Sequence, residues 1–282
     1  MFHRMRQSGC DGTDASIKAM KLYDRVERIH NDLATIEIDG DAPLTVEQLT
    51  PFDHYHYFGT DAVDEAIVAL GLKPGMRVLD IGSGIGGPAR YIAASSGAHV
   101  TALELQPDLD ALAANLTKRC GLANLVEHQC GDILDGLGEV YDSVISFLCF
   151  LHIADRRRLL AACRASLAVG GGMYIEDFAK RRELTVDEAG VLEVKVQCPV
   201  LPSPAEYVVQ LRAAGFVDIH VEDVTSQWTA FTASRLAEFR AARARNVSVH
   251  GLAIVDGLDD FYATVACLFD TGAIAGLKIL AC

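Results

Sequence analysis

The segment that most constrains the fold is residues 78–87, which read Val-Leu-Asp-Ile-Gly-Ser-Gly-Ile-Gly-Gly. Its apolar start predicts a buried strand, and its glycines remove the side chains that would keep a ligand away from the backbone. Residues 88–94 then read as a helix, whose unpaired amide groups would point at the ligand. The segment therefore predicts a strand, turn and helix that hold a nucleotide-like cofactor.

Two cofactor classes compete for this segment. Gly82, Gly84 and Gly87 satisfy the dinucleotide pattern G-x-G-x-x-G, which is a weak signal when it stands alone. Asp80 would repel a pyrophosphate but would favour a ligand that carries an ammonium and a sulfonium, such as S-adenosylmethionine. Glu104 is the acidic residue expected about 20 residues further on for ribose hydroxyls, and both cofactor classes predict it.

Composition limits the partners. The chain has 282 residues, of which 50% are hydrophobic, so it can bury a full core as one large domain or as a domain with a cap. A net charge of -13 opposes nucleic acid or an anionic membrane as partner and favours a small-molecule substrate. We leave the choice between monomer and homodimer open.

The sequence shows no pattern of a membrane span, a secretory signal, a metal site or a disulfide framework. The apolar stretch 144–154 is too short to span a bilayer, and the basic N-terminus has no apolar run behind it, so we expect a cytoplasmic protein. The eight cysteines form no C-x-x-C pair, so we expect neither a metal site nor a disulfide framework.

Alternating strand-like and helical segments predict a Rossmann-like α/β sheet. The expected strands are Arg77–Ile81, His99–Glu104, 125–129, 143–147, 173–177, 217–223 and, last, 273–281. The expected helices are 16–34, Pro107–Arg119, 155–167 with residues 170–172 ending it, 231–245 and 258–269. We divide the chain into an N-terminal helical cap (1–58), a cofactor-binding core (59–225), a helical insertion forming part of a lid (226–270) and the final strand (271–282).

Five features in order resemble one enzyme family. They are the aromatic and histidine segment 55–59, the glycine-rich segment 78–87, Glu104, the pair Gly131-Asp132, and the segment 167–171. Over residues 52–177 the chain resembles class I S-adenosylmethionine-dependent methyltransferases of the small-molecule group. Within that group it is similar to the sarcosine/dimethylglycine, phosphoethanolamine, tocopherol and sterol methyltransferases.

The resemblance implies a mostly parallel seven-stranded sheet whose last strand, here residues 273–281, is antiparallel. It implies that Asp80 and the loop 82–86 hold the methionine moiety, that Glu104 binds the ribose, and that Asp132 with Ile133 lies along the adenine edge. The full expected cofactor set is Tyr57, Asp80, Gly82, Ser83, Gly84, Gly86, Glu104, Leu105, Gln106, Asp132, Ile133 and Phe147. The product would be S-adenosylhomocysteine.

The chain departs from its relatives in two places. Phe58 and Thr60 flank Gly59 where relatives often have a glycine pair, and Ala168-Val169 replaces a basic residue and proline. The first departure bears on the shape of the substrate entrance.

Methyl transfer from a sulfonium needs alignment and exclusion of water more than covalent help. His152 follows the fourth expected strand at the ligand-binding edge, and we assign it as a candidate general base. Phosphoethanolamine relatives have a histidine at the matching place. The alternative is a partly buried histidine bonded to the backbone.

Further residues are candidates for binding the substrate. Tyr55, His56 and Tyr57 could close over the sulfonium, or simply pack the cap against the core. Lys180 and Arg181 could grip a carboxylate or phosphate, although charge runs are usually solvated. Trp228 could line the acceptor pocket or anchor the lid; Tyr23 belongs with the core, and the run 156–158 with the surface.

These observations favour an S-adenosylmethionine-dependent methyltransferase whose acceptor is a small amine. A sterol or isoprenoid acceptor is the nearest alternative. A protein that binds the cofactor without transferring its methyl group, and a nicotinamide oxidoreductase, are the alternatives of other classes.

Overall fold

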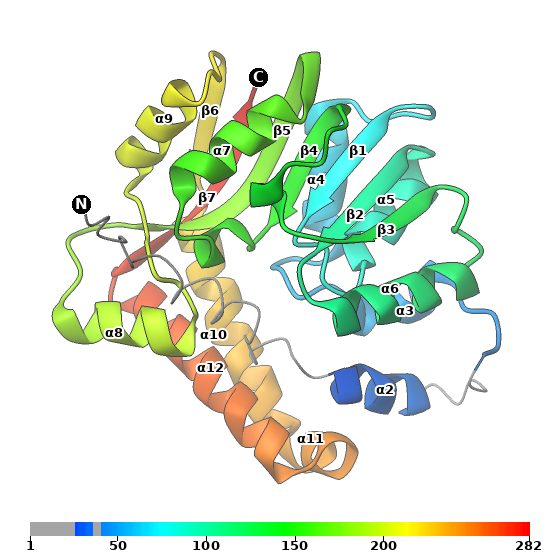
Figure 1. The fold of residues 1–282 in the computed structure, drawn as a ribbon. Helices are drawn as coiled ribbons and strands as arrows, with labels where there is room; N and C mark the ends of the chain where they lie inside the picture. The colour runs from blue at the N-terminus through cyan, green and yellow to red at the C-terminus, as the bar shows by residue number, and fades with distance from the viewer. Residues whose placement is uncertain (1–25, 36–40) are drawn as a thin grey trace, which may run out of the picture.

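The computed structural model describes residues 26–35 and 41–282 (Figure 1). Tyr23 and most of the helix expected over residues 16–34 lie outside these ranges. The end of that helix is described as α2 (Val26–Thr35).

Within the described residues, seven strands form one sheet in the order β3-β2-β1-β4-β5-β7-β6. Their bounds are β1 (Arg77–Ile81), β2 (His99–Glu104), β3 (Val126–Cys130), β4 (Tyr141–Phe147), β5 (Leu167–Lys180), β6 (Ile219–Asp223) and β7 (Ile274–Ala281). The strands β1 to β5 pair in parallel, whereas β7 is antiparallel to both of its neighbours, β5 and β6. The expected Rossmann-like fold with an antiparallel last strand is confirmed.

Helices cover both faces of the sheet. The helices α4 (Thr60–Leu70) and α5 (Gly87–Ser96) pack on one face, and α7 (Arg156–Ala165) and α9 (Pro204–Ala213) on the other. Side chains alternate along β1, because Val78 joins the first layer while Leu79 and Ile81 join the second. The helix α6 (Pro107–Arg119) lies beside β3 and has the expected bounds (Figure 1).

Several expected helix boundaries are wrong. The helix expected over residues 231–245 is two helices, Thr225–Ala241 and Arg243–His250, and the helix expected over residues 258–269 begins at Leu252. The helix expected over residues 155–167 ends at Ala165, and the glycines expected to end it, 170–172, lie inside β5. The reason is that Leu167 already pairs with Tyr141, and the ladder shifts register before it resumes at Ser143 and Gly172. The glycine run accommodates this irregularity because glycine adopts unusual backbone angles at little cost.

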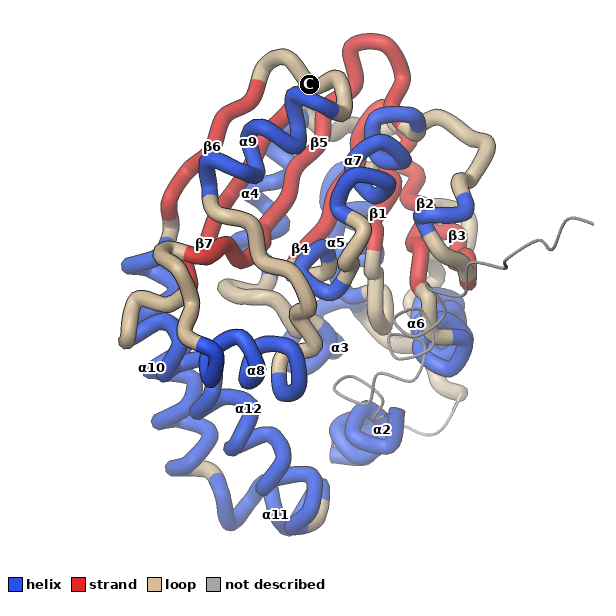
Figure 2. The backbone as a smooth tube through the Cα atoms, turned by 60° about the vertical axis from the view of Figure 1, so that its left-hand side comes forward, coloured by secondary structure: helices blue, strands red, loops and turns tan. Residues whose placement is uncertain are grey.

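The caps lie beyond the carboxyl ends of the parallel strands. They consist of α2, α3 (Val46–Asp53), α8 (Val186–Lys195), α10 (Thr225–Ala241), α11 (Arg243–His250) and α12 (Leu252–Asp270). Figures 1 and 2 show α10 and α12 as a long antiparallel pair that extends away from the sheet, with α11 at its tip. Asp32 of α2 lies 3.2 Å from His250 of α11, so the N-terminal cap (α2 and α3) contacts the C-terminal cap (α8 and α10 to α12).

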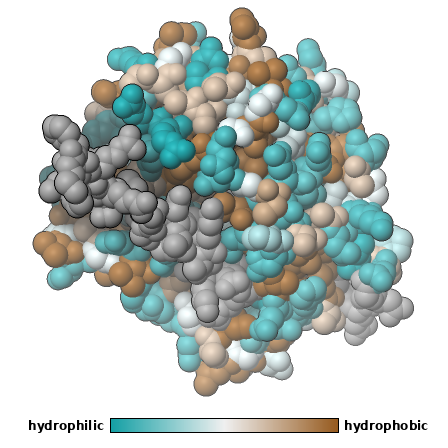
Figure 3. Space-filling view, viewed as in Figure 1, coloured by the Kyte–Doolittle hydropathy of each residue, from teal (hydrophilic) through white to brown (hydrophobic). Residues whose placement is uncertain are grey.

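Polar and apolar side chains share the visible surface (Figure 3). On the face seen in Figure 3, hydrophilic and hydrophobic side chains are interspersed. No helix of the described part of the chain is long and apolar enough to cross a membrane.

Candidate active site

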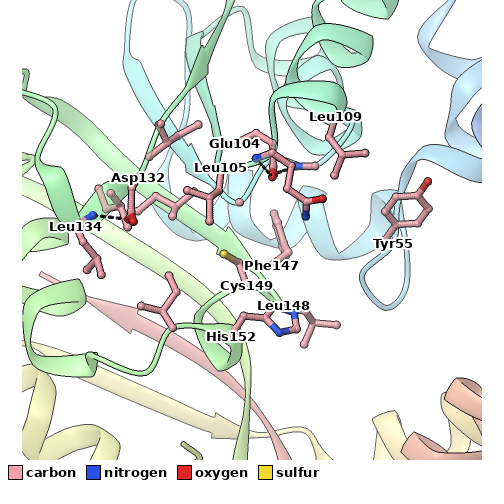
Figure 4. A pocket seen from close by; sticks show the side chains of 18 of the residues that line it. Tyr55, Glu104, Leu105, Leu109, Asp132, Leu134, Phe147, Leu148, Cys149 and His152 are labelled. Atoms are coloured by element: carbon pink, nitrogen blue, oxygen red, sulfur yellow. Dashed lines mark hydrogen bonds between the residues drawn. The ribbon is translucent and has the colours of Figure 1, made fainter. Parts of the chain in front are cut away.

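A cavity with an empty volume of about 1080 Å³, partly open to solvent, lies at the carboxyl ends of β1, β2 and β4. Open α/β sheets bind their ligands at this edge. Eight residues of the expected cofactor set line it: Gly82, Gly84, Glu104, Leu105, Gln106, Asp132, Ile133 and Phe147. Figure 4 shows Glu104, Asp132 and Phe147 approaching the cavity from the ends of separate strands, with Tyr55 on the side of the N-terminal cap.

The glycine-rich turn is shaped by positive φ angles. Gly82 and Gly84 have φ of 73° and 55°, a region that side chains disfavour. The amides of Gly82 and Ser83 both donate to the carbonyl of Leu103, which ties the turn to β2. A Cβ on Gly82 would overlap Cys149, whereas one on Gly84 would meet only open space, so Gly84 leaves room on the cavity side.

Glu104 is fixed by the backbone around it. Its Oε2 accepts from the amide of Gly84 at 2.9 Å and its Oε1 from the amide of Gln106 at 2.9 Å. Burial raises the pKa of Glu104, and the amide hydrogen bonds oppose that rise. Each carboxylate oxygen keeps a further lone pair for a hydroxyl of a bound ribose.

We expect Glu104→Ala to weaken cofactor binding by about 1–3 kcal/mol, because it removes an ionised acceptor and releases two amides of the site. Calorimetric titration with S-adenosylhomocysteine measures the loss. Glu127→Ala, an exposed change on β3, is the matched control. Unchanged affinity in a folded Glu104→Ala protein would place the ribose elsewhere.

Asp80, Ser83 and Gly86 do not line the cavity. Asp80 is 2% exposed, and its Oδ2, like the hydroxyl of Ser83, has no hydrogen-bond partner among the described residues. Burial, and then the charge of Glu104, raise the pKa of Asp80 to about 7. A cationic ligand group beside Asp80 would stabilise its ionised form, which fits the ammonium of S-adenosylmethionine.

His152 lies in the cavity wall, in the short helix η2 (Phe150–His152) that follows β4. Its Nδ1 lies 3.0 Å from the carbonyl of Gln197; because a carbonyl only accepts, Nδ1 is the donor and the neutral ring carries its lone pair on Nε2. Burial lowers the pKa of His152 to about 4, so the ring is neutral at pH 7. The sequence had suggested titration nearer neutral pH.

A buried network that the sequence did not predict supports this turn. Asp177 accepts from the amide of Leu151 at 3.1 Å and from the hydroxyl of Tyr207 at 3.0 Å. Arg156 donates to the carbonyl of Phe150 at 2.8 Å and pairs with Asp177 at 3.3 Å. The expectation that Arg156 lies on the surface is therefore wrong, since it is 4% exposed.

A second cavity, with an empty volume of about 1160 Å³ that includes open solvent, lies between the caps. It shares Tyr55, His56 and Leu148 with the first cavity, so the two meet at these side chains. His56 stacks on Phe147 at 4.5 Å between ring centroids, and its Nε2 lies 2.9 Å from the carbonyl of Gly59. Tyr57 lines the second cavity and not the first.

Three of the expected substrate residues line neither of these cavities. Lys180 contacts Glu183 at 3.0 Å and Glu206 at 3.6 Å, and Arg181 is exposed. Trp228 is fully buried, where its ring fills the space that a Cβ on Gly276 would need. The structure therefore does not bring these three side chains to either cavity.

Backbone strain is concentrated around the site. The non-glycine residues with positive φ in the described part of the chain are Phe58, Leu148 and Gln197. Leu148 lies where the cavities meet, the carbonyl of Gln197 contacts His152, and Phe58 follows Tyr57. Strained residues of this kind are typical of functional sites.

The described residues contain no group of three or more histidine, cysteine or acidic side chains that could hold a metal ion. The sheet, the glycine-rich turn and the adjoining cavities thus define a Rossmann-like, cofactor-binding class of enzyme. Residues 79–173 match the family model described as a methyltransferase domain.

Curated relatives agree with this match. The chain is 30% identical over 183 residues to phosphoethanolamine N-methyltransferase 1 of Zea mays, covering 64% of this chain and 36% of the relative. It is 31% identical over 156 residues to a glycine/sarcosine/dimethylglycine N-methyltransferase of Actinopolyspora halophila, covering 55% of this chain and 28% of the relative. The chain thus spans about a third of the length of these relatives.

Solved structures share the fold. Phosphoethanolamine N-methyltransferase 2 of Haemonchus contortus, in complex with phosphomonomethylethanolamine and S-adenosylhomocysteine, matches with a TM-score of 0.75 at 21% identity, over 81% of this chain and 54% of that one. The cyclopropane synthase MmaA2 of Mycobacterium tuberculosis matches with a TM-score of 0.76 at 17% identity, over 97% of this chain and all of that one (100%).

Proposed function

We propose that the protein is an S-adenosylmethionine-dependent methyltransferase that methylates a small molecule. The cofactor occupies the cavity of Gly82, Gly84 and Glu104, and the acceptor occupies the cavity between the caps. The observation that carries this proposal is that the two cavities meet at Tyr55, His56 and Leu148. In-line transfer requires such a junction between donor and acceptor.

The cofactor would supply an electrophilic methyl group on a sulfonium. Glu104 and Asp132 hold polar groups of the cofactor, while Tyr55 and His56 from the cap exclude water from the junction. The neutral His152 accepts a proton on Nε2 from the acceptor. Asp177 and Arg156 hold the backbone on which His152 lies.

An amine is the acceptor that we propose. The Zea mays and Actinopolyspora relatives are N-methyltransferases by name. A sterol acceptor is the alternative, since sterol 24-C-methyltransferase ERG6B of Gibberella zeae is 26% identical over 185 residues, covering 61% of this chain and 46% of the relative. A transfer assay with labelled S-adenosylmethionine over glycine, sarcosine, dimethylglycine, phosphoethanolamine and sterols separates these acceptors, and transfer to a sterol but to none of the amines would contradict the proposed amine acceptor.

S-adenosylmethionine and S-adenosylhomocysteine should each stabilise the folded protein, because the glycine-rich turn is formed only in the folded state. At about 100 times the dissociation constant the gain in unfolding free energy should be roughly 2.7 kcal/mol. Thermal shift measurements with both compounds and with NAD test this. A shift with NAD alone would contradict the proposed cofactor.

A further inference from the structure

The acceptor cavity has a charge opposite to that of the whole chain. The chain carries a net charge of -13, yet the described residues lining this cavity include Arg28 and Arg235 and no aspartate or glutamate. Arg28 lies 3.9 Å from Asp32, so a neighbouring carboxylate partly balances its charge. The cavity is therefore an electropositive pocket in an acidic protein, which concentrates anions.

Arg235 is the less balanced of the two arginines. Its guanidinium has a hydrogen bond with the side chain of Tyr57, but its Nε is buried without a hydrogen-bond partner among the described residues. Arg240, further along α10, binds Asp259 at 2.8 Å, and Arg243, at the start of α11, binds Asp256 at 2.5 Å. A buried guanidinium donor without a partner is costly unless a ligand satisfies it.

Aromatic rings hold Arg235 at the cavity. Its Cζ lies 4.5 Å from the ring centroid of Tyr262, 4.9 Å from that of Tyr57 and 5.5 Å from that of Phe231. Such rings attract a guanidinium and fix its plane, which prepares its N–H groups for a carboxylate or phosphate. Because the guanidinium of Arg235 already lies over these rings, their faces are not free to bind an ammonium group of the acceptor.

Apolar side chains line a large part of the rest of the cavity. Its lining includes Leu151, Phe178, Val196, Leu258 and Phe261. An acceptor that consisted only of a small charged group would leave these side chains against water. The lining therefore fits an acceptor with an apolar body in addition to its charged group.

We propose that the acceptor amine also carries an apolar body and an anionic group, and that this carboxylate or phosphate binds Arg235. This inference rests on the function proposed above and names the substrate class of the same cavity. The anionic group lies at Arg235 and the atom that receives the methyl group lies toward Leu148. Arg235, and not Lys180 or Arg181, then selects the substrate.

A matched series of probes tests this inference. The probes are 3-phenylpropionate, 3-phenylpropyl phosphate, 3-phenylpropanol and 3-phenylpropylamine, titrated calorimetrically into the whole protein with and without S-adenosylhomocysteine. At least one of the two anions should bind about 10- to 100-fold more tightly than the alcohol, because charge-assisted hydrogen bonds add that much affinity. The tighter of the two anions identifies the carboxylate or the phosphate as the recognised group.

Variants assign the effect to one side chain. Arg235→Gln should abolish the preference for anions over the alcohol, Arg235→Lys should retain part of it, and the control Arg240→Gln should retain all of it. Melting temperatures verify that each variant is folded. Equal binding of anions and alcohol, no binding by either anion, or an unchanged preference in Arg235→Gln would overturn the inference.

The cofactor proposal fails separately. If S-adenosylhomocysteine does not bind, the proposed function is contradicted, while the series without it still reports whether the cavity prefers anions.

Discussion

Replacing His152 with alanine should lower kcat about 100-fold or more and leave cofactor affinity nearly unchanged, as expected when a general base that acts in the transition state is lost. The site geometry supports this role, because Nδ1 is held by the carbonyl of Gln197 and Nε2 carries the lone pair. Steady-state kinetics beside titration with S-adenosylhomocysteine measure both quantities.

The pH profile sharpens the test. A base must be neutral to accept a proton, and burial lowers the pKa of His152 to about 4. The contribution of His152 to kcat/KM should therefore be constant at neutral pH and be lost only as pH falls through about 4. Added imidazole should restore part of the activity of His152→Ala, and His220→Ala, an exposed change on β6, should behave like wild type. Normal turnover in a folded His152→Ala protein would make this residue a packing histidine.

Replacing Asp53 with alanine should lower the unfolding free energy by about 3–5 kcal/mol, because it leaves the buried charge of Arg90 without its partner. Asp53 Oδ2 lies 2.9 Å from Arg90 Nη2, and these side chains are 1% and 0% exposed. The pair joins the end of α3 to α5, the helix that the glycine-rich turn opens. Urea unfolding at pH 7 measures the loss.

A double variant separates the charge from the packing. Asp53→Leu with Arg90→Met removes both charges and should lose clearly less stability than Asp53→Ala, because no unpaired charge remains. Asp61→Ala, an exposed change on α4, should stay within about 0.5 kcal/mol of wild type. If the double variant were as unstable as Asp53→Ala, packing and not charge would explain the loss.

Eight of the twelve residues that sequence patterns assigned to the cofactor line the first cavity, whereas Lys180, Arg181 and Trp228, assigned to the substrate, line neither cavity. The turn at Gly82 and Gly84 and the placement of Glu104 follow from short-range rules, because each residue sits at the end of a strand whose apolar pattern is visible in the chain. The interpretation of Lys180 and Arg181 used the same rule, but their side chains line neither of the two cavities.

Residues whose contacts lie far away in the sequence could not be recognised from a local sequence pattern. Arg235 lies in a helix with no marked apolar face, and its role depends on Tyr57, 178 positions earlier in the chain. Arg156 belongs to a run of three arginines, a pattern typical of a solvated surface, and only the fold turns it inward toward Asp177. For both arginines, the environment of the side chain is set by tertiary packing and not by the local sequence.

The position of β7 determines when the other strands can join the sheet during translation. It is the last strand of the sheet along the chain, but it lies between β5 and β6, and within the sheet β6 bonds only to β7. On the ribosome, β6 therefore has no place in the sheet until residues 274–281 have been made, whereas β1 to β4 already have their neighbours. A nascent chain thus has the parts of its cofactor half long before its acceptor half can close.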